Sequence, residues 1–203
     1  MLGALATIVV PVAMSERLIF FTGPSGAGKT ATAAAYVASR RTPTAFIEAD
    51  AIRGIVRLGP FSAVNAPENQ HGGRFGEYFR LGGRACAALA ATYLDAGIDC
   101  VVNSLRGHAP PPPYEGEWDE LDRFDPFFIV LFPSLDTCIQ RATGRGRTVE
   151  VPRDVAVSHG FDWSAWIEHP RARILDTTDM ALDEVVDAVS RLVDRPPSRT
   201  NAQ

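Results

Sequence analysis

The sequence predicts an α/β fold of three layers, in which a parallel sheet of about five strands carries helices on both faces. Short, almost wholly apolar runs at residues 17–22, 98–103 and 127–132 are typical of strands that are buried on both sides. Stretches with helical character separate these runs, as parallel strands require, because the chain must cross back between them. At 203 residues and 46% hydrophobic, the chain is expected to form one domain.

The first half of the chain is predicted to alternate between strand and helix. Residues 17–22 are large and apolar and end at a glycine loop, and the alanine-rich residues 31–40 favour a helix. A second strand is expected at residues 44–48, followed by a short helix at AIRGIVRL, residues 51–58. The Pro, Asn and Gly content of residues 59–73 predicts a loop.

The second half of the chain continues this alternation. A long helical pattern covers residues 74–96, and DAG closes it before the next strand. The segment HAPPPPYEGEWDE is expected to be an exposed loop, because its four prolines are incompatible with regular structure. The remaining expected elements are strands at residues 98–103, 127–132 and 173–175 and helices at residues 134–142 and 182–193.

The two ends of the chain are expected to lie outside the domain. Met14 begins MSERLIFF, which leads directly into the first strand, so residues 1–13 are interpreted as an N-terminal extension that is not native. Their apolar run is short for a membrane span and lacks the basic start of a signal peptide. Residues 14–195 would then form a single domain, and residues 196–203 a flexible tail.

Charge and cysteine content limit the classes of binding partner and the cellular compartment that we expect for this chain. A net charge of −4 and a pI near 5.6 give no global basic field, which disfavours nucleic acid as a partner without excluding it. Cys86, Cys100 and Cys138 are far apart in apolar runs, so we expect buried, reduced thiols rather than a disulfide or a metal site. We therefore expect a cytoplasmic protein with no membrane partner.

One motif carries most of the chemistry. The residues GPSGAGKT, from Gly23 to Thr30, fit the pattern G-x-x-x-x-G-K-[ST], and they follow a predicted strand and open a predicted helix. In that setting backbone N–H groups surround phosphate oxygens, the Lys29 ammonium reaches the β- and γ-phosphates, and the Thr30 hydroxyl ligates Mg²⁺. Lys29 is also the only lysine among the 20 basic residues. The alternative is a chance glycine-rich turn.

A carboxylate and an arginine follow the second strand. In EADAIRG, Asp50 is expected just past the carboxyl end of residues 44–48, where open α/β sheets bind their ligands. A carboxylate there is placed to accept the proton of an attacking hydroxyl, and Arg53, three residues along a helical turn, would face the same cleft. The alternative is that Asp50 only caps a helix.

Arginines also cluster at the end of the helix predicted for residues 134–142. Arg141, Arg145 and Arg147 lie in or just beyond this helix, in glycine-punctuated sequence that suits a mobile lid near residues 141–150. Such a lid would carry positive charge onto a transferring phosphate. The alternative is a solvated charge cluster at a helix end.

The strand, GPSGAGKT and the D-x-x-R pattern of Asp50 and Arg53 together resemble the small P-loop kinases. These include chloramphenicol phosphotransferase, the polynucleotide kinase domain and zeta-toxin-like kinases. The resemblance extends over about residues 17–194 and implies the P-loop NTPase fold, with ATP and Mg²⁺ as cofactors. The catalytic set that it implies is Lys29, Asp50, Arg53, Arg141 and Arg145. The nucleotide-binding set is Gly23, Pro24, Ser25, Gly26, Ala27, Gly28, Lys29, Thr30, Ala31, Arg141, Asp176 and Thr177.

A stretch near the end of the chain extends the resemblance. RILDTTD is similar to the segment between the last strand and the last helix of these kinases, where the loop borders the adenine. Asp176, Thr177 and Thr178 are equally suited to cap the following helix. The two roles are compatible.

The chain departs from the family at the end of its third strand. Many of these kinases carry an acidic residue there, which orients the waters of the metal, whereas this chain has Asn103. An amide contributes no charge, so Asp50 is expected to join Thr30 in holding the metal. The role of Asp50 as sole base is therefore open.

These observations predict an ATP-dependent kinase that transfers the γ-phosphoryl group to a hydroxyl of a small molecule, such as an antibiotic, a sugar or a nucleoside. Two alternatives stay open, a kinase of nucleic-acid ends and a non-catalytic ATP-binding regulatory module. The acidic pI weighs against the first, and Asp50 with Arg53 weighs against the second. The sequence identifies neither the acceptor nor the oligomeric state, because the loops that shape the acceptor pocket carry no readable code.

Overall fold

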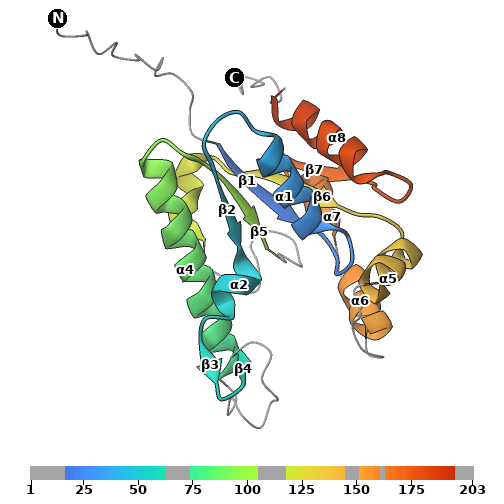
Figure 1. The fold of residues 1–203 in the computed structure, drawn as a ribbon, viewed down its shortest axis with the longest axis horizontal. Helices are drawn as coiled ribbons and strands as arrows, with labels where there is room; N and C mark the ends of the chain where they lie inside the picture. The colour runs from blue at the N-terminus through green and yellow to red at the C-terminus, as the bar shows by residue number, and fades with distance from the viewer. Residues whose placement is uncertain (1–16, 63–73, 105–117, 145–150, 161–162, 195–203) are drawn as a thin grey trace, which may run out of the picture.

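A five-stranded parallel sheet forms the centre of the computed structural model, which describes residues 17–62, 74–104, 118–144, 151–160 and 163–194 (Figure 1). The strand order is β2-β5-β1-β6-β7. The strands span Leu18–Thr22 (β1), Thr44–Glu48 (β2), Asp99–Asn103 (β5), Phe127–Leu131 (β6) and Ala172–Leu175 (β7). Every pairing in this sheet is parallel, so the predicted fold class is confirmed.

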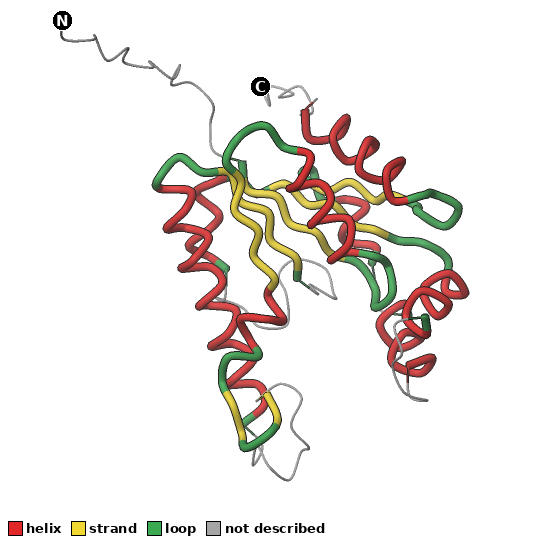
Figure 2. Tube along the Cα trace, in the orientation of Figure 1, coloured by secondary structure: helices red, strands yellow, loops and turns green. Residues whose placement is uncertain are grey.

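Helices cover both faces of the sheet, and Figure 2 shows them in red around the yellow strands. One face carries α4 (Phe75–Asp95), the 3-10 helix η1 (Asp119–Phe124) and α7 (Ser164–Glu168). The other carries α1 (Lys29–Ser39), α5 (Leu135–Thr143), α6 (Val151–His159) and α8 (Leu182–Asp194). Successive side chains of a strand point to opposite faces, so Leu18 and Phe20 of β1 enter one core and Ile19 and Phe21 the other.

The last helix shows how the sequence builds the second core. In α8, Val185, Val186, Val189 and Val193 are buried and follow the 3.6-residue repeat of a helix, which places them on one stripe. Burial of each valine contributes about 1.5–3 kcal/mol. Burial of this stripe against the sheet stabilises α8. Intrinsic helix propensity contributes less, because valine is only a moderate helix former.

The predicted helix at residues 51–58 is wrong beyond its first turn. The helix α2 spans only Ala49–Arg53, and the chain then forms Arg57–Leu58 (β3), which pairs antiparallel with Phe61–Ser62 (β4) inside the predicted loop. Ile55 is β-branched, which favours extended backbone over helix. Gly59, with φ at 60°, provides the left-handed conformation that turns the chain between the two strands.

The prediction of an exposed loop at HAPPPPYEGEWDE is wrong at the end of that segment. Residues 105–117 lie outside the described part of the chain, but Trp118 is only 4% exposed and is the N-cap of η1. Its ring stands edge-on to that of Phe20, with centroids 5.3 Å apart. Burial of the large apolar surface of this indole anchors the segment to the sheet.

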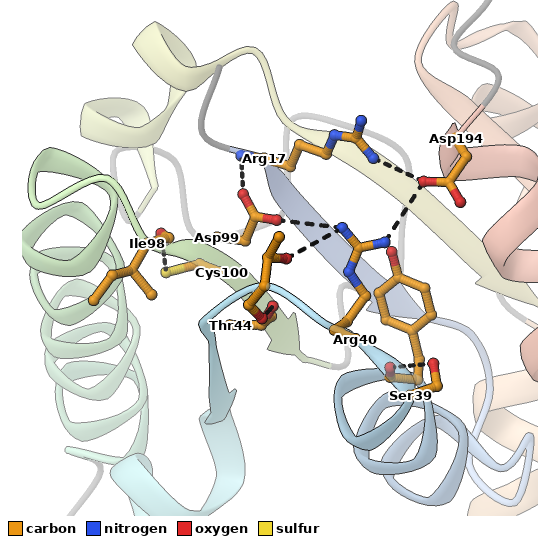
Figure 3. A network of polar contacts seen from close by, with 10 residues as sticks. Arg17, Ser39, Arg40, Thr44, Ile98, Asp99, Cys100 and Asp194 are labelled. Carbon is orange, nitrogen blue, oxygen red and sulfur yellow. Dashed lines mark hydrogen bonds and ion pairs between the residues drawn. The ribbon is translucent and has the colours of Figure 1, made fainter. Parts of the chain in front are cut away.

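Two arginines and two aspartates form a network at the amino ends of the strands (Figure 3): Arg17, Arg40, Asp99 and Asp194. One oxygen of Asp99 accepts from the backbone N–H of Arg17 at 3.0 Å, and the other lies 3.5 Å from Arg40. Asp194 lies 2.9 Å from the Arg17 guanidinium and 3.5 Å from that of Arg40. Because Arg40 caps α1 and Asp194 ends α8, the network joins both helices to β1 and β5.

The predictions about the chain ends, the cysteines and membrane spans have different outcomes. The proposed extension at residues 1–13 and tail at residues 196–203 lie outside the described residues. The three cysteines are free and buried, as predicted. Among the described helices, none has the length and apolar character needed to cross a membrane.

Candidate functional site

The carboxyl ends of three neighbouring strands bring the predicted site residues to one edge of the sheet. β5 pairs with β1 on one side and with β2 on the other. The glycine loop after β1, the helix α2 after β2, and Asn103 at the end of β5 therefore meet at this edge. This is the edge at which open α/β sheets bind their ligands.

The glycine loop packs tightly against β6 and α5. At Gly23, where φ is 137°, a Cβ atom would lie 2.1 Å from the carbonyl oxygen of Leu131. At Gly26, where φ is 80°, it would lie 2.2 Å from that of Cys138. Both distances are far inside van der Waals contact, so only glycine fits. The loop ends at Gly28, the N-cap of α1, so its N–H groups lie at the positive end of an 11-residue helix.

The Lys29 ammonium folds back over this loop. Its Nζ donates to the carbonyl oxygens of Gly23 and Pro24, both at 2.9 Å. A bound phosphate would compete with these carbonyls, because charge-assisted hydrogen bonds to anionic oxygens are stronger than bonds to neutral acceptors. The ammonium of Lys29 therefore lies against the glycine loop.

The loop also rests on α6, a contact that the sequence did not predict. The backbone N–H of Ser25 donates to Ser158 Oγ at 2.9 Å, and Ser158 Oγ donates to the carbonyl oxygen of Val155 at 3.0 Å. Ser158 is buried. No sequence motif predicts a contact between this serine and the loop, because only the packing of α6 brings the two together.

The structure adds a carboxylate that sequence reasoning missed, Glu48 at the end of β2. Asn103, which is 2% exposed, directs Nδ2 to Oε1 and Oε2 of Glu48 at 2.8 and 2.7 Å. The same Nδ2 donates to Thr30 Oγ1 at 2.9 Å. Asn103 Oδ1 is buried and has no hydrogen-bond partner among the described residues. The available signal was an acidic residue at a strand end, but only the strand order shows that this strand lies beside Asn103.

Asp50 and Arg53 lie on α2 in contrasting environments. The Asp50 side chain is 77% exposed, whereas that of Arg53 is 2% exposed, and Arg53 Nη1 lies 3.7 Å from Asp50 Oδ1 and 3.4 Å from Ser104 Oγ. The guanidinium carbon lies 3.9 Å from the centroid of the Phe79 ring, and Gly82 of the same helix packs directly against the arginine stem. Arg53 is therefore a fixed cation beside an accessible carboxylate.

Arg141 connects the glycine loop to the segment RILDTTD. Its Nη2 donates to the carbonyl oxygen of Thr177 at 2.8 Å, and its Nη1 lies 3.4 Å from Thr177 Oγ1. The same Nη1 lies 3.4 Å from the carbonyl oxygen of Ala27. Two predicted nucleotide-binding residues, distant in sequence, are thus in direct contact.

The neighbouring Asp176 forms a compact turn with Thr178. Its Oδ1 accepts from the Thr178 hydroxyl at 2.6 Å and from the Thr178 N–H at 2.9 Å. These two hydrogen bonds lower the pKa of the Asp176 carboxyl below its ordinary value. Arg145 and Arg147, predicted for the lid, lie outside the described residues.

Comparison with known proteins identifies a fold but no family. No protein-family model and no curated protein matches the chain. Two solved structures are similar over 90% of this chain, each with a TM-score of 0.57. One is an unliganded sugar kinase from a Janibacter species, with 18% identity and 96% of its own chain covered. The other is a kinase candidate from Chloroflexus aurantiacus, with 15% identity and 98% covered.

At these identities the similarity concerns the fold. The parallel sheet order, the helices on both faces and the glycine loop after β1 together define a P-loop kinase-like α/β fold. Lys29 begins α1, and Asp50 and Arg53 lie on α2, so all three belong to helices of this framework.

Proposed function

We propose that this protein is an ATP-dependent kinase that transfers the γ-phosphoryl group to a hydroxyl of a small molecule, such as an antibiotic, a sugar or a nucleoside. The observation that carries the proposal is a glycine loop with Lys29 and Thr30 on the same sheet edge as Asp50 and Arg53. A nucleotide-binding module needs only the loop, whereas a transferase also needs groups that act on the acceptor. The fold similarity to a sugar kinase supports the same conclusion.

The loop would hold the phosphates of ATP through its backbone N–H groups and through Lys29. Arg141, Asp176 and Thr177 are proposed for the nucleoside end of ATP. Their support is the contact of Arg141 with both the loop and Thr177. Arg145 remains a proposal for the lid.

The residues beside Thr30 fit a magnesium ion. Thr30 Oγ1 accepts one hydrogen bond from Asn103 and keeps a further lone pair, and Asn103 Oδ1 has no partner in the described part of the chain. Such hard oxygen donors suit Mg²⁺, which would offset phosphate charge when bound with ATP. Thr30 and Asp50 are the residues that we expect from the sequence to hold this ion.

Asp50 would accept the proton of the acceptor hydroxyl on a carboxylate oxygen. Its exposure leaves that oxygen accessible to an acceptor, and Arg53, fixed against Phe79, orients the carboxylate from 3.7 Å. The Arg53 charge would also stabilise negative charge that develops during transfer.

The proposal is tested by ATP turnover with a panel of hydroxyl compounds and a 5′-hydroxyl oligonucleotide. Asp50→Asn should lower acceptor phosphorylation by about 10²-fold, the usual scale for a general base, while ATP affinity is unchanged. Asp95→Asn is the matched control, because Asp95 is an exposed carboxylate at the far end of α4 that pairs with Arg123. It should keep the wild-type rate.

Two outcomes would favour the other functions. Phosphorylation of the oligonucleotide alone would assign a kinase of nucleic-acid ends. Tight ATP binding without transfer to any acceptor, and with ATP turnover unchanged in Asp50→Asn, would assign a regulatory module.

A further inference from the structure

We infer that Glu48, and not Asp50, supplies the carboxylate of the magnesium site, and that Asn103 is the positioning residue that couples Glu48 to Thr30. The inference rests on the proposed function, because it concerns the metal that accompanies ATP. The end of β5 has an uncharged amide, Asn103, so the negative charge of the site would come from the end of β2. Glu48 and Asn103 are register partners on these adjacent strands.

The hydrogen-bond geometry places Glu48 beside the hydroxyl that would ligate the metal. One amide group, Asn103 Nδ2, lies 2.7–2.8 Å from both Glu48 oxygens and 2.9 Å from Thr30 Oγ1. Carboxylate and hydroxyl are therefore both within hydrogen-bond distance of a single nitrogen atom. Because Thr30 Oγ1 accepts from this amide with one lone pair, its other lone pair remains for a metal ion.

Charge distinguishes the two carboxylates. Asp50 has the Arg53 guanidinium 3.7 Å away, so its negative charge already faces a cation. Glu48 is half-buried, and within the described ranges no arginine or lysine forms an ion pair with it. Its neighbour is the neutral Asn103 amide. A partly buried carboxylate without a counter-charge is unfavourable, and a divalent cation would remove that cost.

The buried acceptor on Asn103 is a second, independent observation. Since Nδ2 faces Glu48 and Thr30, Oδ1 is the remaining amide atom, and it has no partner among the described residues. Buried acceptors in native proteins are rarely left unsatisfied. Mg²⁺ keeps several of its waters when it binds to proteins, and such waters are donors of the kind that Oδ1 lacks.

The assignment resolves the double role, base and metal ligand, that was expected for Asp50. With Glu48 at the metal, Asp50 is left to act on the acceptor hydroxyl. Substitution of Glu48 should then weaken metal binding, whereas substitution of Asp50 should slow acceptor phosphorylation without weakening metal binding.

The test uses the full chain, ADP and Mn²⁺ as the probe, so that it does not depend on turnover. Free Mn²⁺ is measured by electron paramagnetic resonance with the protein in excess over ADP. Glu48→Gln should weaken Mn²⁺ binding to the protein–ADP complex by about 10- to 100-fold, the range for groups that orient or charge a metal site. ADP affinity in EDTA should be unchanged, which shows that the loop is intact. Asp50→Asn and the remote control Asp95→Asn should leave Mn²⁺ affinity unchanged.

A charge swap separates a metal role from a structural one. In the double variant Glu48→Gln/Asn103→Asp, the amide and the carboxylate exchange strands and still form a complementary pair. The Thr30 hydroxyl, which accepts from Asn103 in the wild type, would then donate to the new carboxylate. Mn²⁺ affinity should return to within a few-fold of wild type if negative charge beside Thr30 is what the metal needs. This variant also keeps the test valid should the single variant fold poorly.

The outcomes distinguish failure of this inference from failure of the proposed function. Loss of Mn²⁺ affinity in Asp50→Asn with no loss in Glu48→Gln, or no recovery in the swap, overturns the inference and leaves the kinase proposal standing. A wild-type ADP affinity that Mn²⁺ does not change also overturns it. Absence of ADP binding under every condition would instead remove the proposed function.

Discussion

Replacement of Gly82 by alanine tests the packing that fixes Arg53. Glycine in a helix interior costs about 1 kcal/mol relative to alanine, so helix propensity alone predicts a more stable protein. The new Cβ atom, however, would lie 2.3 Å from Cγ, 2.9 Å from Cα and 3.0 Å from Cβ of Arg53. Because Cα belongs to the backbone, rotation of the arginine side chain does not relieve the overlap. Overpacking of this kind costs up to about 3 kcal/mol, which leaves a net destabilisation of up to about 2 kcal/mol.

Gly76→Ala is the matched control on the same helix. Its Cβ atom would approach the flexible end of Arg80 at an ordinary 3.6 Å, so the variant should gain up to about 1 kcal/mol. For a chain of this length, thermal denaturation should show a Tm lowered by about 4–8 °C for Gly82→Ala and unchanged or raised by up to about 4 °C for Gly76→Ala. Gly82→Ala should also slow acceptor phosphorylation, because Arg53 is displaced. A Gly82→Ala protein as stable as wild type would refute the close packing of α4 on α2.

Four further predictions concern Lys29, Tyr36 and the buried cysteines. Lys29→Ala should weaken ATP binding by about 10- to 100-fold in calorimetry without lowering Tm, because its ammonium donates to neutral loop carbonyls of Gly23 and Pro24 and would meet charged phosphates in the complex. Tyr36→Phe should leave the free energy of unfolding in urea unchanged or raise it by about 1 kcal/mol, since the buried hydroxyl has no hydrogen-bond partner among the described residues; a loss of that size would contradict this. Burial raises the pKa of Cys100 to about 12 and also raises that of Cys138, so native protein should resist thiol reagents at pH 8, whereas denatured protein should react at all three cysteines. The same shift keeps Cys100 protonated in the native state while the unfolded thiol ionises near pH 8.5, so stability in urea should fall as pH rises from about 8.5 toward 12.

Elements with a strong local pattern were predictable, and elements that depend on distant partners were not. All five strands of the sheet lie where their apolar runs predict them, within a residue at each end. The hairpin β3–β4 and the helix η1 were missed, because short elements carry little periodicity of their own. Trp118 is the clearest case, since its burial depends on a contact with Phe20 almost a hundred residues away in the chain.

The candidate site divides in the same way. The sequence by itself determined the glycine loop, Lys29 and Thr30, because phosphate binding by a loop between a strand and a helix is encoded in consecutive residues. Only the tertiary structure decided that Glu48 lies beside Asn103 and that Arg141 contacts Thr177. These pairs meet because β2 lies next to β5 and α5 lies near the loop after β7. Strand order and helix packing are set by the burial of whole faces, and that free energy is distributed over the entire core rather than written at any one position.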